Sequence, residues 1–173
     1  MPASASGPEP EADRTHVITR RYDAPARLLF MAWSKPEHLM RWFGPRGWPV
    51  TMCEVDFRVG GRFRMAMTGP SGEQDAPFGG RYHEIVPGRK IVFDNGFESP
   101  GAPRMIVTVT FEEAGGGTTL AITTLFESIA MKIKYLGLGY AQGFGSGLDQ
   151  LADVAAQLLA EEGALAGSSS PSF

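Results

Sequence analysis

Three neighbouring residues in one expected strand, Tyr82, His83 and Glu84, carry the functional groups of acid–base chemistry. Because successive side chains of a strand alternate between its faces, Tyr82 and Glu84 should share one face and His83 the other. A carboxyl group buried beside a tyrosine needs a partner or a raised pKa, and either can mark an active site. Glu84 could then serve as general acid or base in a cyclase-like reaction, with Tyr82 or His83. The alternative is that Glu84 lies on an exposed sheet face.

A second set of residues is suited to holding an apolar molecule. Large aromatic side chains with one polar end fit a pocket for a ring or an acyl chain, and methionine adapts to ligands of varied shape. The alternative for each member is ordinary core packing. The residues predicted to contact such a ligand are Phe30, Trp33, Trp42, Phe63, Met65, Tyr82, Phe93, Val109, Tyr140, Gly143 and Phe144.

Open space is suggested by a glycine-rich segment that begins the clearest helical pattern of the chain. Gly139, Gly143 and Gly147 are four residues apart, so they stack along one helix face. Each glycine weakens a helix by roughly 1 kcal/mol relative to alanine. Such a face therefore needs a reason, either the close approach of another backbone or space kept open beside it. Since strands precede this helix, the pattern predicts an internal cavity between the helix and a curved sheet.

Other kinds of site are not predicted. His16, His38 and His83 are far apart and show no metal-ligand spacing with the single cysteine, Cys53, so we expect neither a metal nor a cofactor. The segment 145–147, Gly-Ser-Gly, lacks the five-residue pattern of a nucleophile elbow. The glycine-rich stretches also lack a phosphate-binding pattern.

Composition bounds the function classes further. The 173 residues carry a net charge of −3 and are 43% hydrophobic, which argues against a broad basic surface for nucleic acid. The chain has no apolar run of about 18 residues, so membrane insertion is not expected. A lone cysteine fits a reducing, cytoplasmic setting. Residues 1–14 and 163–173 have the composition of disordered tails, which leaves a single domain at 15–162.

The order of expected elements is that of an α+β fold. A strand at 15–22 precedes two short helices, whose starts are marked by Pro25 and Pro36. Turn-linked strands then predict an antiparallel meander. The expected strands of the meander are 50–57, 62–67, 79–86, 90–95, 104–111 and 118–126. A long helix from about Gly139 to Glu161 closes the domain, with a buried stripe at helical spacing.

Several short segments, in this order, form a recognisable set. They are Tyr22-Asp23-Ala24-Pro25, Trp42-Phe43-Gly44-Pro45, Asp56-Phe57-Arg58-Val59-Gly60-Gly61-Arg62-Phe63, Gly80-Arg81-Tyr82-His83-Glu84-Ile85 and the glycine-rich start of the last helix. Together they resemble the AHSA1-like branch of the START/Bet v 1 (SRPBCC) superfamily. The resemblance implies the helix-grip fold, in which a curved antiparallel sheet grips a long C-terminal helix and encloses a cavity. Two short helices after the first strand cover one end of that cavity.

We consider three functions. The first is binding of a hydrophobic or aromatic small molecule in an internal cavity, and the second is an aromatase/cyclase-like reaction at Glu84. The third, implied by the resemblance alone, is a co-chaperone-like or stress-response role with an Hsp90-type ATPase. An enzyme needs titratable groups that converge on one point, whereas a partner module favours a filled interior and a large exposed patch. Homodimerisation through a sheet edge or face is left open.

Overall fold

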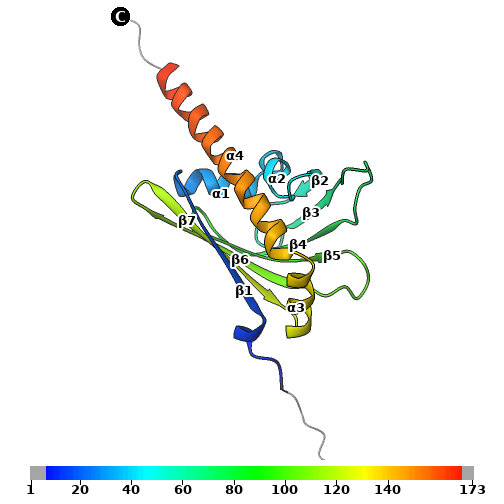
Figure 1. Cartoon of the computed structure of the whole chain (residues 1–173). Helices are drawn as coiled ribbons and strands as arrows, with labels where there is room; N and C mark the ends of the chain where they lie inside the picture. Colours follow the sequence, from blue (N-terminus) through cyan, green and yellow to red (C-terminus); the bar gives the residue numbers. More distant parts are fainter. Residues whose placement is uncertain (1–6, 169–173) are drawn as a thin grey trace, which may run out of the picture.

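One seven-stranded antiparallel sheet, in the order β1-β7-β6-β5-β4-β3-β2, forms a layer against which the helices pack (Figure 1). The computed structural model describes residues 7–168. Its elements are η1 (Glu11–Arg14), β1 (Thr15–Tyr22), α1 (Ala26–Ser34), α2 (Pro36–Trp42), β2 (Val50–Val55), β3 (Arg62–Met67), β4 (Phe78–Val86), β5 (Lys90–Phe97), β6 (Met105–Ala114), β7 (Gly117–Phe126), α3 (Ile129–Gly137) and α4 (Tyr140–Ser168). The predicted α+β fold and its antiparallel meander are confirmed.

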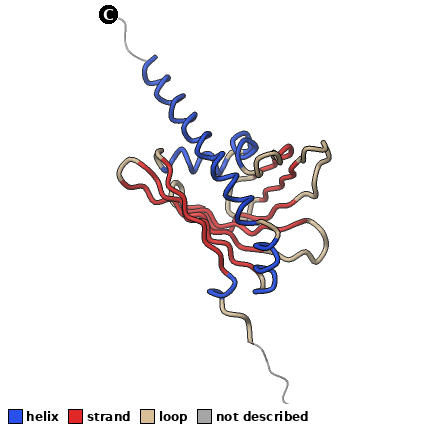
Figure 2. The backbone as a smooth tube through the Cα atoms, in the orientation of Figure 1, coloured by secondary structure: helices blue, strands red, loops and turns tan. Residues whose placement is uncertain are grey.

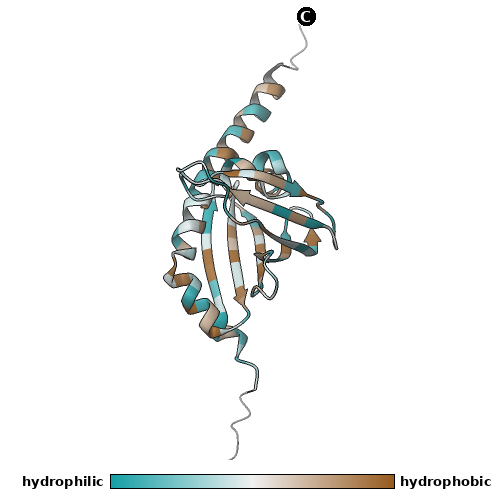
Figure 3. Ribbon diagram, turned by 90° about the vertical axis from the view of Figure 1, so that its right-hand side faces the viewer, coloured by the Kyte–Doolittle hydropathy of each residue, from teal (hydrophilic) through white to brown (hydrophobic). Residues whose placement is uncertain are grey.

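Hydropathy alternates along the strands, as the colours of the ribbon in Figure 3 show. Because successive side chains point to opposite faces, this alternation gives the sheet one apolar face. Along β6, Met105, Val107, Val109 and Phe111 are buried, while the residues between them are partly or largely exposed. β7 pairs with β6 along its whole length, from Met105↔Phe126 to Ala114↔Gly117. The two glycines of the connecting turn have φ values of 64° and 80°, which suits the tight hairpin predicted there.

One irregularity changes which β4 side chains face the interior. Tyr82 pairs with Phe93 and Glu84 pairs with Val92, so His83 is the extra residue of a β-bulge. Tyr82 is buried, but His83 and Glu84 are both exposed. The expectation that Tyr82 and Glu84 share a face is wrong, because the bulge shifts the alternation by one residue and turns Glu84 outward.

α4 lies across the sheet, as Figure 2 shows, and buries a stripe that includes Leu148, Leu151 and Leu158. The helix continues to Ser168, past the expected end at Glu161. The other buried members of the stripe are Val154 and Ala155. None of the described helices has the length and apolarity needed to cross a membrane.

Two elements lie where none was expected. Residues 11–14, assigned to a disordered tail, form η1, and Arg14 Nη1 donates to the Phe126 carbonyl at 2.9 Å. The unassigned segment after β7 forms α3, whose N-terminus is capped by Ser128 Oγ accepting from the Met131 amide at 3.0 Å. Residues 163–168 of the expected C-terminal tail belong to α4, and residues 1–6 and 169–173 lie outside the described residues.

Gly147 is where α4 meets another backbone. A Cβ atom at this position would lie 2.9 Å from the Trp42 carbonyl oxygen and 3.3 Å from that of Phe43. The glycine therefore admits the end of α2 directly against α4. Gly139 has a different role, since its φ of 92° forms the bend between α3 and α4.

Hydrogen bonds from α4 side chains hold the segment that follows α2. Gln150 Nε2 donates to the Gly44 carbonyl at 2.6 Å, and Ser146 Oγ accepts from the Arg46 amide at 2.9 Å. We call the contact of 42–46 with 146–150 the α2–α4 junction. It provides a partner for a carbonyl group at the end of α2, where helical carbonyls lack intrahelical partners.

Substituting Gly147→Ala should lower the free energy of unfolding by about 1–3 kcal/mol, because the new methyl group must displace backbone carbonyls. This outcome opposes the gain of about 1 kcal/mol that alanine brings to a helix. Gly163→Ala, on the same helix with nothing within 4 Å of the added atom, is the matched control and should be neutral or stabilising. Urea unfolding measures both. Equal stabilisation by the two substitutions would contradict the close approach.

Candidate functional site

A groove of about 450 Å³ opens to solvent beside the first turns of α4. It lies between α3 and α4 on one side and β3, β4 and β5 on the other, with the loop after α2 closing one end. Its lining residues are Phe43, Pro45, Trp48, Met67, Asp75, Phe78, Asn95, Phe97, Tyr135, Leu138, Gly139, Tyr140, Gly143 and Phe144. The side chains are predominantly apolar, and half of the lining residues are aromatic.

Gly143 keeps one wall of the groove bare. A Cβ atom at this position would lie 3.4 Å from Pro45 Cγ, so even a methyl group would narrow the space. The three glycines of this helix face therefore have different roles. Gly139 forms the bend before α4, Gly143 lines the groove, and Gly147 admits the backbone at the end of α2. Both reasons proposed from the sequence for helical glycines are found in this structure, at different positions.

The interior beyond the groove is nearly filled. A void of about 10 Å³, room for about one water molecule, is lined by Trp33, Leu39, Phe43, Phe63, Met65, Tyr82, Ile91 and Phe93. Phe43 borders both spaces, with its ring stacked on Phe78 at 6.1 Å and edge-on to Phe144 at 6.0 Å. In place of the enclosed cavity expected between helix and sheet, there is a small void and an open groove separated by Phe43.

The predicted ligand-contacting residues divide among three places. Tyr140, Gly143 and Phe144 line the groove. Trp33, Phe63, Met65, Tyr82 and Phe93 line the small void. Phe30, Trp42 and Val109 border neither space; they pack the core, with the Phe30 ring 5.5 Å from Phe111 and Trp42 Nε1 donating to the Ala32 carbonyl at 2.9 Å.

Most of the groove's lining is absent from the predicted ligand contacts given above. Trp48 and Phe97 are 40% and 41% exposed, and they come from a loop and from the end of a strand, where periodicity carries no signal. Tyr135 and Leu138 belong to α3 and the bend after it, for which no element was expected. Besides the glycine spacing, a tryptophan in a loop with two prolines is a sequence feature that points to this place.

The groove's polar groups are few. Tyr140 shares a hydrogen bond with Thr124, with 2.8 Å between the two hydroxyl oxygens, and burial raises the Tyr140 pKa to about 12. Tyr140 is therefore a neutral phenol at physiological pH. Asn95 Oδ1 accepts from the Gly96 amide at 2.9 Å, and Asp75 Oδ1 accepts from the Ala76 amide at 3.0 Å.

The three residues considered for acid–base chemistry do not meet. Tyr82 points inward, and burial raises its pKa above the ordinary tyrosine value. Glu84 lies on the outer face and is ion-paired with Lys90, with 3.1 Å between the carboxylate and the ammonium nitrogen. His83 Nε2 lies 2.6 Å from Asp94 Oδ2 on the same outer face. A shared site for Tyr82, His83 and Glu84 therefore has no geometric support.

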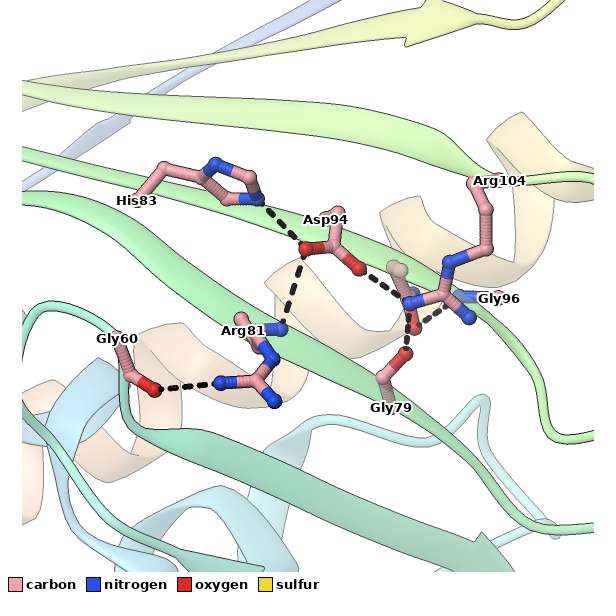
Figure 4. Close-up of polar contacts among 8 residues, drawn as sticks. Gly60, Gly79, Arg81, His83, Asp94, Gly96 and Arg104 are labelled. Carbon is pink, nitrogen blue, oxygen red and sulfur yellow. Dashed lines mark hydrogen bonds and ion pairs between the residues drawn. The ribbon is translucent and has the colours of Figure 1, made fainter.

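Asp94 is the centre of a polar network on the outer face of the sheet, drawn in Figure 4. Its carboxylate contacts His83 and Arg104 and accepts from the Arg81 amide at 3.3 Å, while Arg104 Nη2 also donates to the Gly79 carbonyl at 2.7 Å. Burial disfavours the charged carboxylate, but the hydrogen bonds from Arg104 and His83 outweigh this, so the Asp94 pKa lies below its usual value. The network stabilises the sheet and is separate from the groove.

Across residues 7–168, no three His, Cys, Asp or Glu side chains gather as metal ligands. Cys53 is half-buried in β2, and burial raises its pKa to about 11, so its thiol is protonated at neutral pH. We assign it to packing.

A profile of the Activator of Hsp90 ATPase homolog 1-like (AHSA1-like) proteins matches residues 23–156. The chain belongs to this family. The match includes α1, α2, all strands from β2 to β7, α3 and α4 up to residue 156. No curated protein matches the chain.

Solved structures agree with the family. A Chromobacterium violaceum protein is 31% identical, with a TM-score of 0.69 over 82% of this chain and 96% of that one. An Arthrobacter aurescens protein is 26% identical, with a TM-score of 0.78 over 90% and 93%. A Nitrosomonas europaea protein, 24% identical, shows the same fold at a TM-score of 0.78 over 86% and 98%. These neighbours confirm the helix-grip fold.

Substituting Asp94→Asn should destabilise this AHSA1-like protein at pH 7 by about 1–3 kcal/mol, because charged hydrogen bonds to Arg104 and His83 are weakened. The depressed Asp94 pKa means that its contribution is present above the unfolded-state value of about 3.9 and is lost as the pH falls through the folded value. Urea unfolding at pH 7 and below about pH 3 measures the effect. The substitution should cost less stability at the acid end, and an equal loss at both pH values would contradict a charged role.

Proposed function

We propose that this AHSA1-like protein binds a hydrophobic small molecule with an aromatic or alkyl body in the groove beside Gly143. The supporting observation is that a space of about 450 Å³ is walled by aromatic and aliphatic side chains. Ligand sites commonly occupy about 300–1,000 Å³ and bury mainly apolar ligand surface. The small interior void alone, at about 10 Å³, could hold no such molecule.

Binding is favoured over catalysis by the chemistry of the lining. General acid–base catalysis requires a titratable group within hydrogen-bond reach of the reacting atom, and normally a second group in a complementary role. In the groove, the Tyr140 hydroxyl is engaged with Thr124 and has a raised pKa. Asp75 is the single carboxylate among the lining residues. We therefore propose a carrier or sensor of an apolar compound.

An Hsp90-type partner stays a second candidate. The family name suggests it, and apolar side chains exposed at the groove's rim could contact a partner protein. Leu138 is 76% exposed and Phe97 41%. Stimulation of an Hsp90-type ATPase by the purified chain, abolished by Leu138→Asp, would favour this role over small-molecule binding.

Substituting Gly143→Leu should abolish binding of a neutral apolar probe, because the new side chain occupies the groove wall. The probe is N-phenylnaphthylamine, whose fluorescence rises in an apolar site, titrated into the wild-type protein and the variant. Gly163→Leu is the matched control, since its position on the same helix has nothing within 4 Å. Circular dichroism checks that both variants keep the fold.

The expected result is saturable binding by the wild-type protein and Gly163→Leu, with at least about a tenfold loss, or about 1.4 kcal/mol, for Gly143→Leu. Unchanged probe binding by a folded Gly143→Leu variant would place the apolar site elsewhere. Absence of saturable binding by the wild-type protein would count against the proposed function itself.

A further inference from the structure

The charge of the groove restricts the ligands it can accept. Among the lining residues named above, Asp75 is the only one with a charged side chain, and none is Lys, Arg or His. A carboxylate-bearing ligand would therefore meet a like charge and no cation. This disfavours fatty acids and aromatic acids, the simplest apolar ligands with a polar end.

Asp75 is held in place without being neutralised. Its backbone amide donates to the Met67 carbonyl at 2.7 Å. This hydrogen bond holds the second half of the 68–77 loop against the end of β3. Its Oδ1 atom accepts from the Ala76 amide at 3.0 Å. Within residues 7–168 no ion pair involves Asp75, in contrast to Asp94 and Glu98, which are paired with arginine. The carboxylate keeps acceptor capacity for a ligand.

The aromatic rings of the groove also favour a positively charged ligand. Trp48, Phe97 and Tyr135 line the groove together with Asp75. The face of an aromatic ring attracts a cation, most strongly for tryptophan, and aromatic cages are a known means of ammonium recognition. Asn95, whose Oδ1 is engaged by the Gly96 amide, is the one side-chain amide among the lining residues.

We propose that the groove is selective for hydrophobic amines: molecules with an aromatic or alkyl body in the groove and a protonated amine beside Asp75. This inference rests on the proposed function and specifies the ligand's charge. The aromatic and aliphatic wall binds the body, and Asp75 with the neighbouring ring faces binds the ammonium group.

The test uses three probes of matched shape that displace N-phenylnaphthylamine: phenylbutylamine, phenylbutanol and phenylbutyrate. At low ionic strength the amine should bind at least about tenfold more tightly than the carboxylate, with the alcohol between them. The preference should shrink as salt is added, because Asp75 is exposed and its field is screened over about 10 Å at 0.1 M salt.

Two variants locate the effect. Asp75→Asn keeps the shape and an acceptor for the Ala76 amide, and it should remove the amine preference while leaving phenylbutanol binding unchanged. Glu73→Gln makes the same change in net charge on the same loop, at a residue that does not line the groove, and should keep the preference.

The outcomes separate this inference from the proposed function. If N-phenylnaphthylamine binds but phenylbutyrate competes as well as phenylbutylamine, the proposal of an apolar binding site is kept. The proposed selectivity for amines is then refuted. Equal loss of preference in Glu73→Gln and Asp75→Asn would refute the role of Asp75 in particular. If the wild-type protein binds no neutral probe, the proposed function fails, and the inference fails with it.

Discussion

The carbonyl groups that end α2 rest directly on the bare backbone of α4 at Gly147, and the architecture of the site depends on this contact. Because no side chain separates the two helices there, α2 lies close enough for Gln150 and Ser146 to hold the following segment by hydrogen bonds. Trp42 extends the same contact inward, since its indole donates to α1 and its ring lies 4.6 Å from that of Trp33. The junction thus connects α4 to α1 and α2, which lie far from it in the sequence.

The groove is a consequence of where this contact ends. One helical turn before Gly147, at Gly143, a Cβ atom would meet the side chain of Pro45 at 3.4 Å and no backbone atom, and the groove opens here. Phe43, the first residue beyond α2, is fixed between the stacked Phe78 ring and the interior. It separates the open groove from the nearly filled core. Close packing and accessible space therefore arise from neighbouring positions on a single helix face.

Local sequence signals predicted the framework well, because strands and hairpins depend on near neighbours. Pro36 lies at the start of α2, as expected, and Gly88 in the turn between the expected strands 79–86 and 90–95 has a φ of 71°. The elements that failed depend on distant residues. η1 is anchored by the Phe126 carbonyl, and the Ile129 amide at the start of α3 donates to Glu9 Oε2 at 3.2 Å. Neither contact can be read from nearby residues.

The site was less predictable for the same physical reason. His83 is an extra residue in β4, and it turns the Glu84 side chain to the opposite face of the sheet. An alternating sequence pattern does not indicate where such a bulge occurs. Trp33 and Phe93 were expected to contact a ligand because they are large and aromatic, but that property equally suits the core they form. An aromatic residue type alone does not distinguish a side chain that lines a groove from one that fills the core. The difference depends on the distance between the backbones of the elements that carry the side chains. Only the glycine spacing carried information on that distance, and Gly143 does line the groove.

The most direct measurement of the central claim is an NMR titration of the folded protein with an apolar ligand, followed by methyl, amide and aromatic signals. The account predicts saturable shifts concentrated on the groove, at Leu138, Phe144 and Trp48, with Val109 and the outer-face Asp94 network unchanged. Shifts confined to the outer face, or spread evenly without saturation, would contradict it.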